Sequence, residues 1–171
     1  MTAEFRYGLI TGAGICLWIT AEYYLGLHTA HPEVGEYTGY FSVLVPVLTL
    51  FLLLRQKQAA SRHGSLSLGQ GAGAGLTTSF LAALIVYGFM IAYNQWINPD
   101  WIDNALTVKV ATMRAHRVDE AEIRRMITSF RWANGARGML VSTMLGLTVV
   151  GGIISVILTL LLRFQSRSRK E

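Results

Sequence analysis

The stretch RQKQAASRHGSLSLGQGAGAG, residues 55–75, separates two long apolar runs and decides how the rest of the chain is arranged. Its first half carries no acid but contains Arg55, Lys57, Arg62 and His63. Short basic loops of multi-pass membrane proteins stay in the cytoplasm, so this composition predicts a cytoplasmic hairpin between two spanning helices. The second half places glycines four residues apart, which predicts close packing of the helix that begins there.

The composition of the whole chain also indicates a membrane protein. Of the 171 residues, 52% are hydrophobic and 15% are charged, which is too apolar for an average soluble domain. The formal net charge of +5 does not indicate nucleic-acid binding, because the Lys and Arg residues lie in loops and in the tail rather than on one face. The single cysteine, Cys16, excludes a disulfide or a cysteine-based metal site within the chain.

Four apolar runs are each long enough to cross a hydrocarbon core of about 30 Å as a helix that rises ~1.5 Å per residue. They predict spanning helices over residues 7–27, 37–54, 72–96 and 138–162, with a kink at Pro46 in the second. We therefore expect one all-α membrane domain with four transmembrane helices. Small residues expected at its helix contacts are Gly8, Gly12, Gly71, Gly75, Gly146 and Gly151.

The segment 98–137 is polar but strongly patterned. Asn98 is expected to cap one helix with Pro99 at its first position, and Asp119 to cap a second helix. Each has an apolar stripe, which predicts two short amphipathic helices that cover the bundle, lie on the bilayer or bind a partner. The candidate partner or lipid surface consists of Ile102, Leu106, Met113, Ile123, Met126, Ile127, Phe130, Arg124 and Arg125. The two arginines are equally consistent with a solvated helix face.

The distribution of charge predicts the orientation of the chain. More than half of the Lys and Arg residues lie at the N-terminus, in the 55–75 hairpin and in the tail, and the short loop after the first run has none. The positive-inside rule then places both termini in the cytoplasm. The segment 98–137 is also basic, but acids dilute its charge, so we expect it on the extracytoplasmic side.

Several different short motifs are spread along the chain. They are YGLITG at residues 7–12, GSLSLGQ at 64–70, Tyr93 with INPD at 97–100, and GIIS at 152–155. Together they resemble a family of small bacterial inner-membrane proteins catalogued as a domain of unknown function, in which Gly is followed by Ile-Ser-Phe-Gly-Gln in the loop; Leu68 stands here in place of the aromatic residue. The resemblance covers nearly the whole chain. It implies a four-span fold and a location in the inner membrane, but no activity.

Glu22 is the sharpest candidate for a chemical site. An acid inside a spanning helix is costly and suggests a proton or cation site. Its position near the far end of the first run, beside Tyr23 and Tyr24, is instead typical of an interfacial or structurally paired acid. The residues leave both interpretations open.

Other chemistry has less support in the sequence. His28, His31, Glu33 and Glu36 offer ligand atoms for a metal, but their spacing matches no template, so neither a metal nor a cofactor is expected. The glycines of 69–75 lack the preceding strand and the following Lys-Ser or Lys-Thr of a phosphate-binding loop. No nucleophile, base and orienting group stand at a recognisable spacing, so we expect no enzyme.

These observations predict a non-enzymatic interaction or accessory protein of the bacterial inner membrane, whose biochemical activity the residues do not disclose. Its expected partners are the lipid bilayer and either a second copy or another membrane protein, and not nucleic acid. The alternative is a small oligomeric transporter coupled through Glu22. A transporter should contain a polar cavity that reaches Glu22, whereas an accessory protein should have a closed bundle and an exposed apolar groove.

Overall fold

The computed structural model describes residues 1–27, 32–61 and 65–168, and the regular elements in these ranges are helices without any strand. In chain order they are α1 (Ala3–Tyr24), α2 (Pro32–Thr38), the 3-10 helix η1 (Gly39–Val43), α3 (Leu44–Ala60), α4 (Leu68–Ala92), the π-helix η2 (Tyr93–Ile97), α5 (Trp101–Ala115), α6 (Glu120–Asn134) and α7 (Ala136–Ser168). The expected all-α architecture is confirmed for the described residues.

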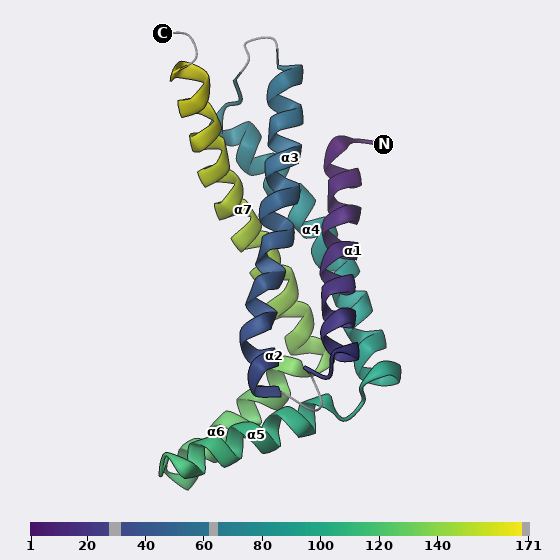
Figure 1. The fold of residues 1–171 in the computed structure, drawn as a ribbon, viewed down its shortest axis with the longest axis vertical. Coiled ribbons are helices and arrows are strands. Elements are labelled where there is room, and N and C mark those ends of the chain that lie inside the picture. Colours follow the sequence, from purple (N-terminus) through teal and green to yellow (C-terminus); the bar gives the residue numbers. More distant parts are fainter. Residues whose placement is uncertain (28–31, 62–64, 169–171) are drawn as a thin grey trace.

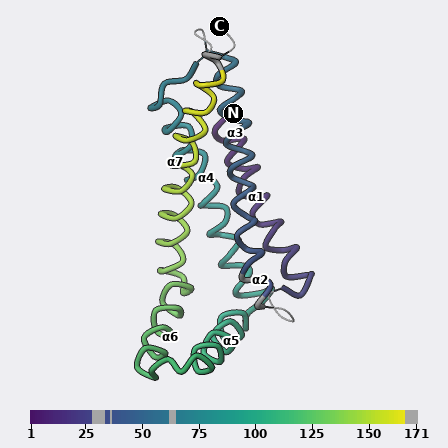
Figure 2. Tube along the Cα trace, turned by 60° about the vertical axis from the view of Figure 1, so that its left-hand side comes forward, coloured from purple at the N-terminus to yellow at the C-terminus, as the bar shows by residue number. Residues whose placement is uncertain are grey.

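The helices α1, α3, α4 and α7 run along the long axis and form a bundle in which α4 contacts the other three (Figure 1). The start of α1 and the end of α7 lie toward one end of this bundle, together with the end of α3 and the start of α4. Arg6 donates a hydrogen bond to Gln56 there, and Lys57 forms an ion pair with Glu4. The helices α5 and α6 lie at the opposite end, across the bundle axis (Figure 2). This α5–α6 pair is referred to below as the arm.

The stretch 55–75 is mostly helical rather than a loop. The helix α3 continues to Ala60 and α4 begins at Leu68, so the predicted end at 54 and the predicted start at 72 are both wrong. Ser67 and Gln70 form a capping box, with the Gln70 amide donating to Ser67 Oγ at 3.1 Å and the Ser67 amide donating to Gln70 Oε1 at 2.9 Å. Two backbone donors are thus satisfied where the helix starts, which explains why it begins one turn early.

The second predicted span is divided into three helical segments. The helical run continues from α2 through η1 to α3, and Gly39–Ala60 covers most of the predicted span 37–54, but its first five residues are 3-10 rather than α-helical. Pro46 lies in the first turn of α3. Proline lacks the amide that would donate to the carbonyl four residues earlier, which lies in η1, so the change from 3-10 to α-helical geometry falls beside Pro46.

Three helical stretches among the described residues are long and apolar enough to cross a bilayer: Gly39–Ala60, Leu68–Ile97 and Ala136–Gln165. The protein therefore has helices suited to a membrane. The first predicted span, α1, is not among them, because Glu22, the tyrosines near its end and the glycines along it make it less apolar. Three of the four predicted spans meet this criterion.

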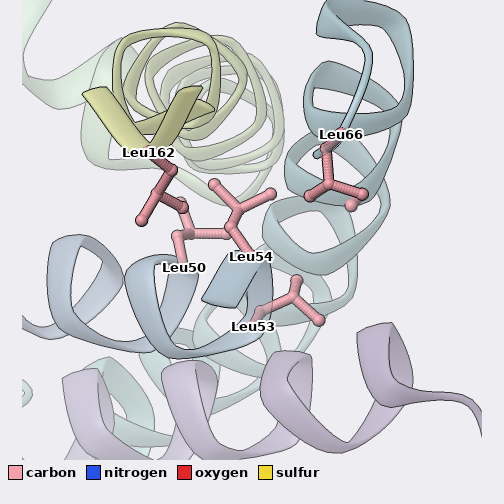
Figure 3. Packing of buried hydrophobic residues seen from close by; sticks show 6 residues of the cluster. Leu50, Leu53, Leu54, Leu66 and Leu162 are labelled. Carbon is pink, nitrogen blue, oxygen red and sulfur yellow. The ribbon is translucent and has the colours of Figure 1, made fainter. Parts of the chain in front are cut away.

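The apolar core lies in the half of the bundle that is nearer to the chain termini. Leu50, Leu53 and Leu54 of α3 are fully buried there. Leu66, which precedes α4, and Leu162 of α7 pack into the same cluster (Figure 3). These side chains come from segments that are far apart in the sequence, so their burial ties α3 to α4 and α7.

Small residues bring α4 and α7 into close contact in an antiparallel register. A Cβ atom added to a glycine on either helix would overlap a hydroxyl side chain on the other, so the backbones are as close as glycine permits. The facing pairs, in order toward the arm, are Gly71 with Thr159, Gly75 with Ser155, and Ser79 with Gly151.

The remaining predicted packing glycines differ in their surroundings. Gly8 and Gly12 of α1 face Leu81 and Ile85 of α4, and a Cβ at either glycine would lie 2.8 Å from the facing Cβ. Gly146 instead faces open space, with no atom within 4 Å of an added Cβ. Gly146 is not on the face of α7 that carries Gly151, Ser155 and Thr159, so the expectation of a helix contact at Gly146 is wrong.

Candidate functional site

The arm is a pair of helices joined by a tight turn. Its helix α5 begins at Trp101 with Asp100 at the cap, so the prediction of an Asn98 cap is wrong. The prediction for α6 is confirmed, since Asp119 caps it and accepts a hydrogen bond from the Ala121 amide at 3.0 Å. The turn between them is left-handed at Arg117, with φ of 57°.

Two ion pairs link the helices of the arm. Arg131 donates to Asp103 at 2.7 Å, and Arg114 donates to Glu120 at 2.9 Å. The hydrogen bond from Arg114 lowers the pKa of the Glu120 carboxyl, and the same contact raises the pKa of Arg114. All four side chains are exposed, so these pairs orient the two helices more than they stabilise them.

The predicted partner or lipid surface is largely turned inward. Leu106 and Ile123 are buried, with exposed fractions of 5% and 1%. Arg124 and Arg125 are exposed on α6. The other predicted residues are half-buried, namely Ile102, Met113, Met126, Ile127 and Phe130. The two apolar stripes pack on each other, and α6 also packs on α7, so only the charged side of α6 is fully available to a partner.

An apolar cavity of about 320 Å³ lies where the arm meets the ends of α1 and α4, and it is referred to below as the arm pocket. The bundle contributes walls from Ile19, Met90 and Tyr93, and the chain after α1 adds Leu27. The arm contributes Trp101, Ala105, Val108, Lys109 and Phe130. Its volume is near the lower end of the range of ~300–1,000 Å³ that is usual for ligand pockets.

A buried polar cluster lies beside the arm pocket. Tyr93 is 2% exposed, Asn98 is 6% exposed, and the Asn98 side-chain amide donates to the Tyr93 hydroxyl at 3.2 Å. The Tyr23 ring packs edge-on against the Tyr93 ring, with centroids 5.9 Å apart. Trp101 donates from its indole nitrogen to the Asn94 side-chain oxygen. These contacts hold the start of the arm against the end of α4.

Glu22 belongs to the same region. Its side chain is 4% exposed and lies close enough to Tyr93 for an electrostatic interaction. The neighbouring helices cover Glu22, so of the interfacial or structurally paired acid that the sequence suggested, only the interfacial alternative is wrong. Two backbone hydrogen bonds close the end of α1 here: the Gly26 amide donates to the Tyr23 carbonyl, and the Leu27 amide donates to the Glu22 carbonyl. Gly26 has φ of 75°, so the helix closes in a Schellman motif that directs Leu27 into the arm pocket.

Sequence reasoning missed the arm pocket and the Tyr93–Asn98 contact. A π-helical turn brings residues five apart into contact, and the backbone amide of Asn98 donates a hydrogen bond to the backbone carbonyl of Tyr93 at 2.8 Å. The available signal was the polar residues at the end of an otherwise apolar helix. His28 and His31, which the metal hypothesis concerned, lie outside the described residues, as do the side chains of Glu33 and Glu36.

The fold and this region define a class: an all-helical protein with helices that could span a membrane and a two-helix arm at one end of the bundle. The chain belongs to the family described as Protein of unknown function (DUF4199), whose model matches residues 6–163. This match confirms the resemblance to a domain of unknown function that the short motifs predicted. No curated protein and no solved structure matches the chain.

Proposed function

We propose that the protein is a non-enzymatic accessory protein of the bacterial inner membrane, with four spans and with the exposed face of α6 as its docking surface. The fourth span in this proposal is α1. Its 22 residues measure about 33 Å as a helix, which matches the hydrocarbon core. Gly8 and Gly12 pack against α4, so the bundle covers one side of α1 and reduces the cost of its polar residues.

The orientation in this proposal follows the basic residues. The start of α1, the end of α3, the start of α4 and the end of α7 lie toward one end of the bundle. Arg6, Lys57 and Arg163 belong to that end, which supports its placement in the cytoplasm. The arm then lies on the extracytoplasmic side.

The observation that carries the accessory role is the exposed face of α6. Arg125 and Trp132 lie seven residues apart on one side of this helix, and Trp132 is 64% exposed although tryptophan is costly to leave in water. Tryptophan and arginine are the residues most often found as anchors in protein interfaces. The exposed Arg124 and Arg125 favour a partner with an acidic surface.

A photo-crosslinking residue introduced at Arg125 in native membranes tests this proposal. We expect a discrete protein adduct that is lost with Trp132→Ala. The matched control is Trp96→Ala, since Trp96 is 79% exposed but lies outside the arm, and this variant should retain the adduct. Adducts with lipid alone, adducts with a second copy alone, or no adduct in folded protein would contradict docking of a distinct protein partner.

A second candidate function is transport coupled through Glu22, which its burial in α1 favours because an ionisable group in a membrane helix is costly without a use. The arm pocket is apolar and Glu22 is not one of its lining residues, which supports the accessory role instead. Glu22→Gln separates the two functions. Cation binding or proton uptake that requires Glu22 would favour transport, and unchanged binding would remove this candidate.

A further inference from the structure

We propose that exposed tyrosine and tryptophan side chains around the arm end of the bundle lie among the phospholipid headgroups, and that the arm stands in the water just outside them. This surface, referred to below as the aromatic belt, consists of Tyr24, Tyr37, Tyr40 and Trp96. The proposal rests on the four-span placement proposed above. It deepens that placement by stating where the docking surface on α6 lies relative to the bilayer.

The side chains of the aromatic belt are highly exposed for their size. The exposed fraction is 82% for Tyr24, 74% for Tyr37, 73% for Tyr40 and 79% for Trp96. They belong to the end of α1, to α2, to η1 and to η2, and these segments lie toward the arm end of the bundle (Figure 1). Each side chain joins an apolar ring to a polar group, and the boundary between hydrocarbon and headgroups suits both parts.

The apolar helical stretches end where the aromatic belt begins. The stretch Gly39–Ala60 starts beside Tyr40, and the stretch Leu68–Ile97 ends beside Trp96. The rings of Tyr23 and Tyr93 are in contact, so the ends of α1 and α4 lie at one level of the bundle. The helices α1, α3 and α4 therefore lose their apolar character near one level, as a flat bilayer surface requires.

Exposed arginines mark the opposite boundary of the same layer. Arg6 and Arg55 are exposed, and Arg6 donates a hydrogen bond to Gln56, so the two arginines lie at one level of α1 and α3. At ~1.5 Å per α-helical residue and ~2.0 Å per 3-10 residue, Arg6 lies about 27 Å from Tyr24, and Arg55 about 24 Å from Tyr40. Both lengths are close to the hydrocarbon thickness of ~30 Å.

The charges of the arm place it beyond the aromatic belt. The chain leaves η2 through the exposed residues Pro99 and Asp100 before α5 begins. The two ion pairs that link α5 to α6 are both exposed, and exposed charges in hydrocarbon would be costly. The docking surface on α6 then faces the water next to the headgroups, within reach of a partner that lies at the membrane surface.

The depth of single nitroxide labels tests this placement. The full-length protein carries Cys16→Ser and one new cysteine at a time, in vesicles of phosphatidylethanolamine and phosphatidylglycerol. Oxygen concentrates in hydrocarbon and a nickel chelate stays in water, so the rates at which each collides with the label report its depth. Labels at Tyr24→Cys and Trp96→Cys should show intermediate rates with both reagents.

Two matched controls lie on the same helices but nearer the middle of the bilayer. Labels at Leu17→Cys of α1 and Leu84→Cys of α4, both at exposed positions, should collide often with oxygen and rarely with the chelate. A label at Arg125→Cys on the arm should show the reverse. Circular dichroism shows whether each variant is folded, and Gln95→Cys, at an exposed position in η2, replaces Trp96→Cys if that variant does not fold.

Three results for the labels of the aromatic belt would overturn the proposal. Oxygen rates equal to those of the controls would place the belt inside the hydrocarbon, and chelate rates equal to those at Arg125 would place it in water. Low rates with both reagents would show that a protein or a second copy covers the belt. A label at Leu17 that collides mainly with the chelate would instead refute α1 as a span, so the belt and the four-span placement can fail separately.

Discussion

The side-chain amide of Asn98 donates a hydrogen bond to the hydroxyl of Tyr93, 3.2 Å away, across one π-helical turn. Both residues are almost fully buried. The contact joins the last turn of the α4 stretch to the residue that leads into the arm, so it sets the direction in which the chain leaves the bundle. The arm pocket lies directly beside it.

Asn98→Ala should destabilise the protein by about 1–3 kcal/mol, because it removes the hydrogen bond that the buried Tyr93 hydroxyl accepts from the Asn98 side chain. Thermal unfolding in a mild detergent measures this loss. Gln95→Ala is the control, since Gln95 is exposed in the same turn. The double variant Tyr93→Phe with Asn98→Ala should lose less stability than the two single variants lose together. Full additivity would show that the hydrogen bond does not couple the two residues.

Gly75→Ala should destabilise the contact between α4 and α7, because the added Cβ would overlap Ser155 and come within 3.1 Å of the Gly151 carbonyl oxygen. Overpacking of this kind costs about 1–3 kcal/mol. Gly73→Ala is the matched control on the same helix. Its Cβ meets no atom within 4 Å, and alanine favours the helix by roughly 0.5–1 kcal/mol over glycine. Unfolding midpoints that shift in the same direction for both variants would contradict this packing.

Arg117→Gly should stabilise the arm. Arg117 has φ of 57°, and the bonds from Arg117 to the Arg114 carbonyl and from Val118 to the Met113 carbonyl form a Schellman motif. The left-handed conformation costs a residue with a Cβ about 1–2 kcal/mol, and glycine adopts it without that strain. Hydrogen exchange at the amides of α5 should slow in this variant. Arg117→Ala keeps the Cβ and should not slow it, which separates strain from loss of charge.

The ion pair between Glu4 and Lys57 should make stability depend on pH. The hydrogen bond from Lys57 lowers the pKa of Glu4 below its ordinary value of 4.5. Its contribution is therefore fully present above pH 4.5 and is lost as the pH falls through the lowered pKa.

Unfolding of the unchanged protein and of Glu4→Gln, measured between neutral and acid pH, checks this dependence. The difference between the two proteins should shrink as the pH falls below 4.5. Glu120→Gln is the control, because Glu120 also has a lowered pKa but its side chain is exposed, so its removal should change stability less. A difference for Glu4→Gln that stays constant over this range would contradict the role of the ion pair.

Local signals predicted the arm better than they predicted the bundle. The cap of α6 at Asp119 follows from nearby side chains and was predicted from the sequence. The start of α4 was missed because the capping box of Ser67 and Gln70 lies within a glycine-rich stretch that was interpreted as a loop. The 3-10 helix η1 just before Pro46 was missed because the change from η1 to α3 leaves no clear mark in the apolar pattern.

The sequence by itself determined the helical class, the amphipathic pair and the family, because hydrophobic periodicity, capping residues and short motifs are local properties of the chain. The stretch 55–75 contains the basic turn and the glycines that bring α4 against α7. Only the tertiary structure buried Glu22 and enclosed the arm pocket. Burial and cavities depend on which helices meet, and those contacts join residues that are far apart in the chain.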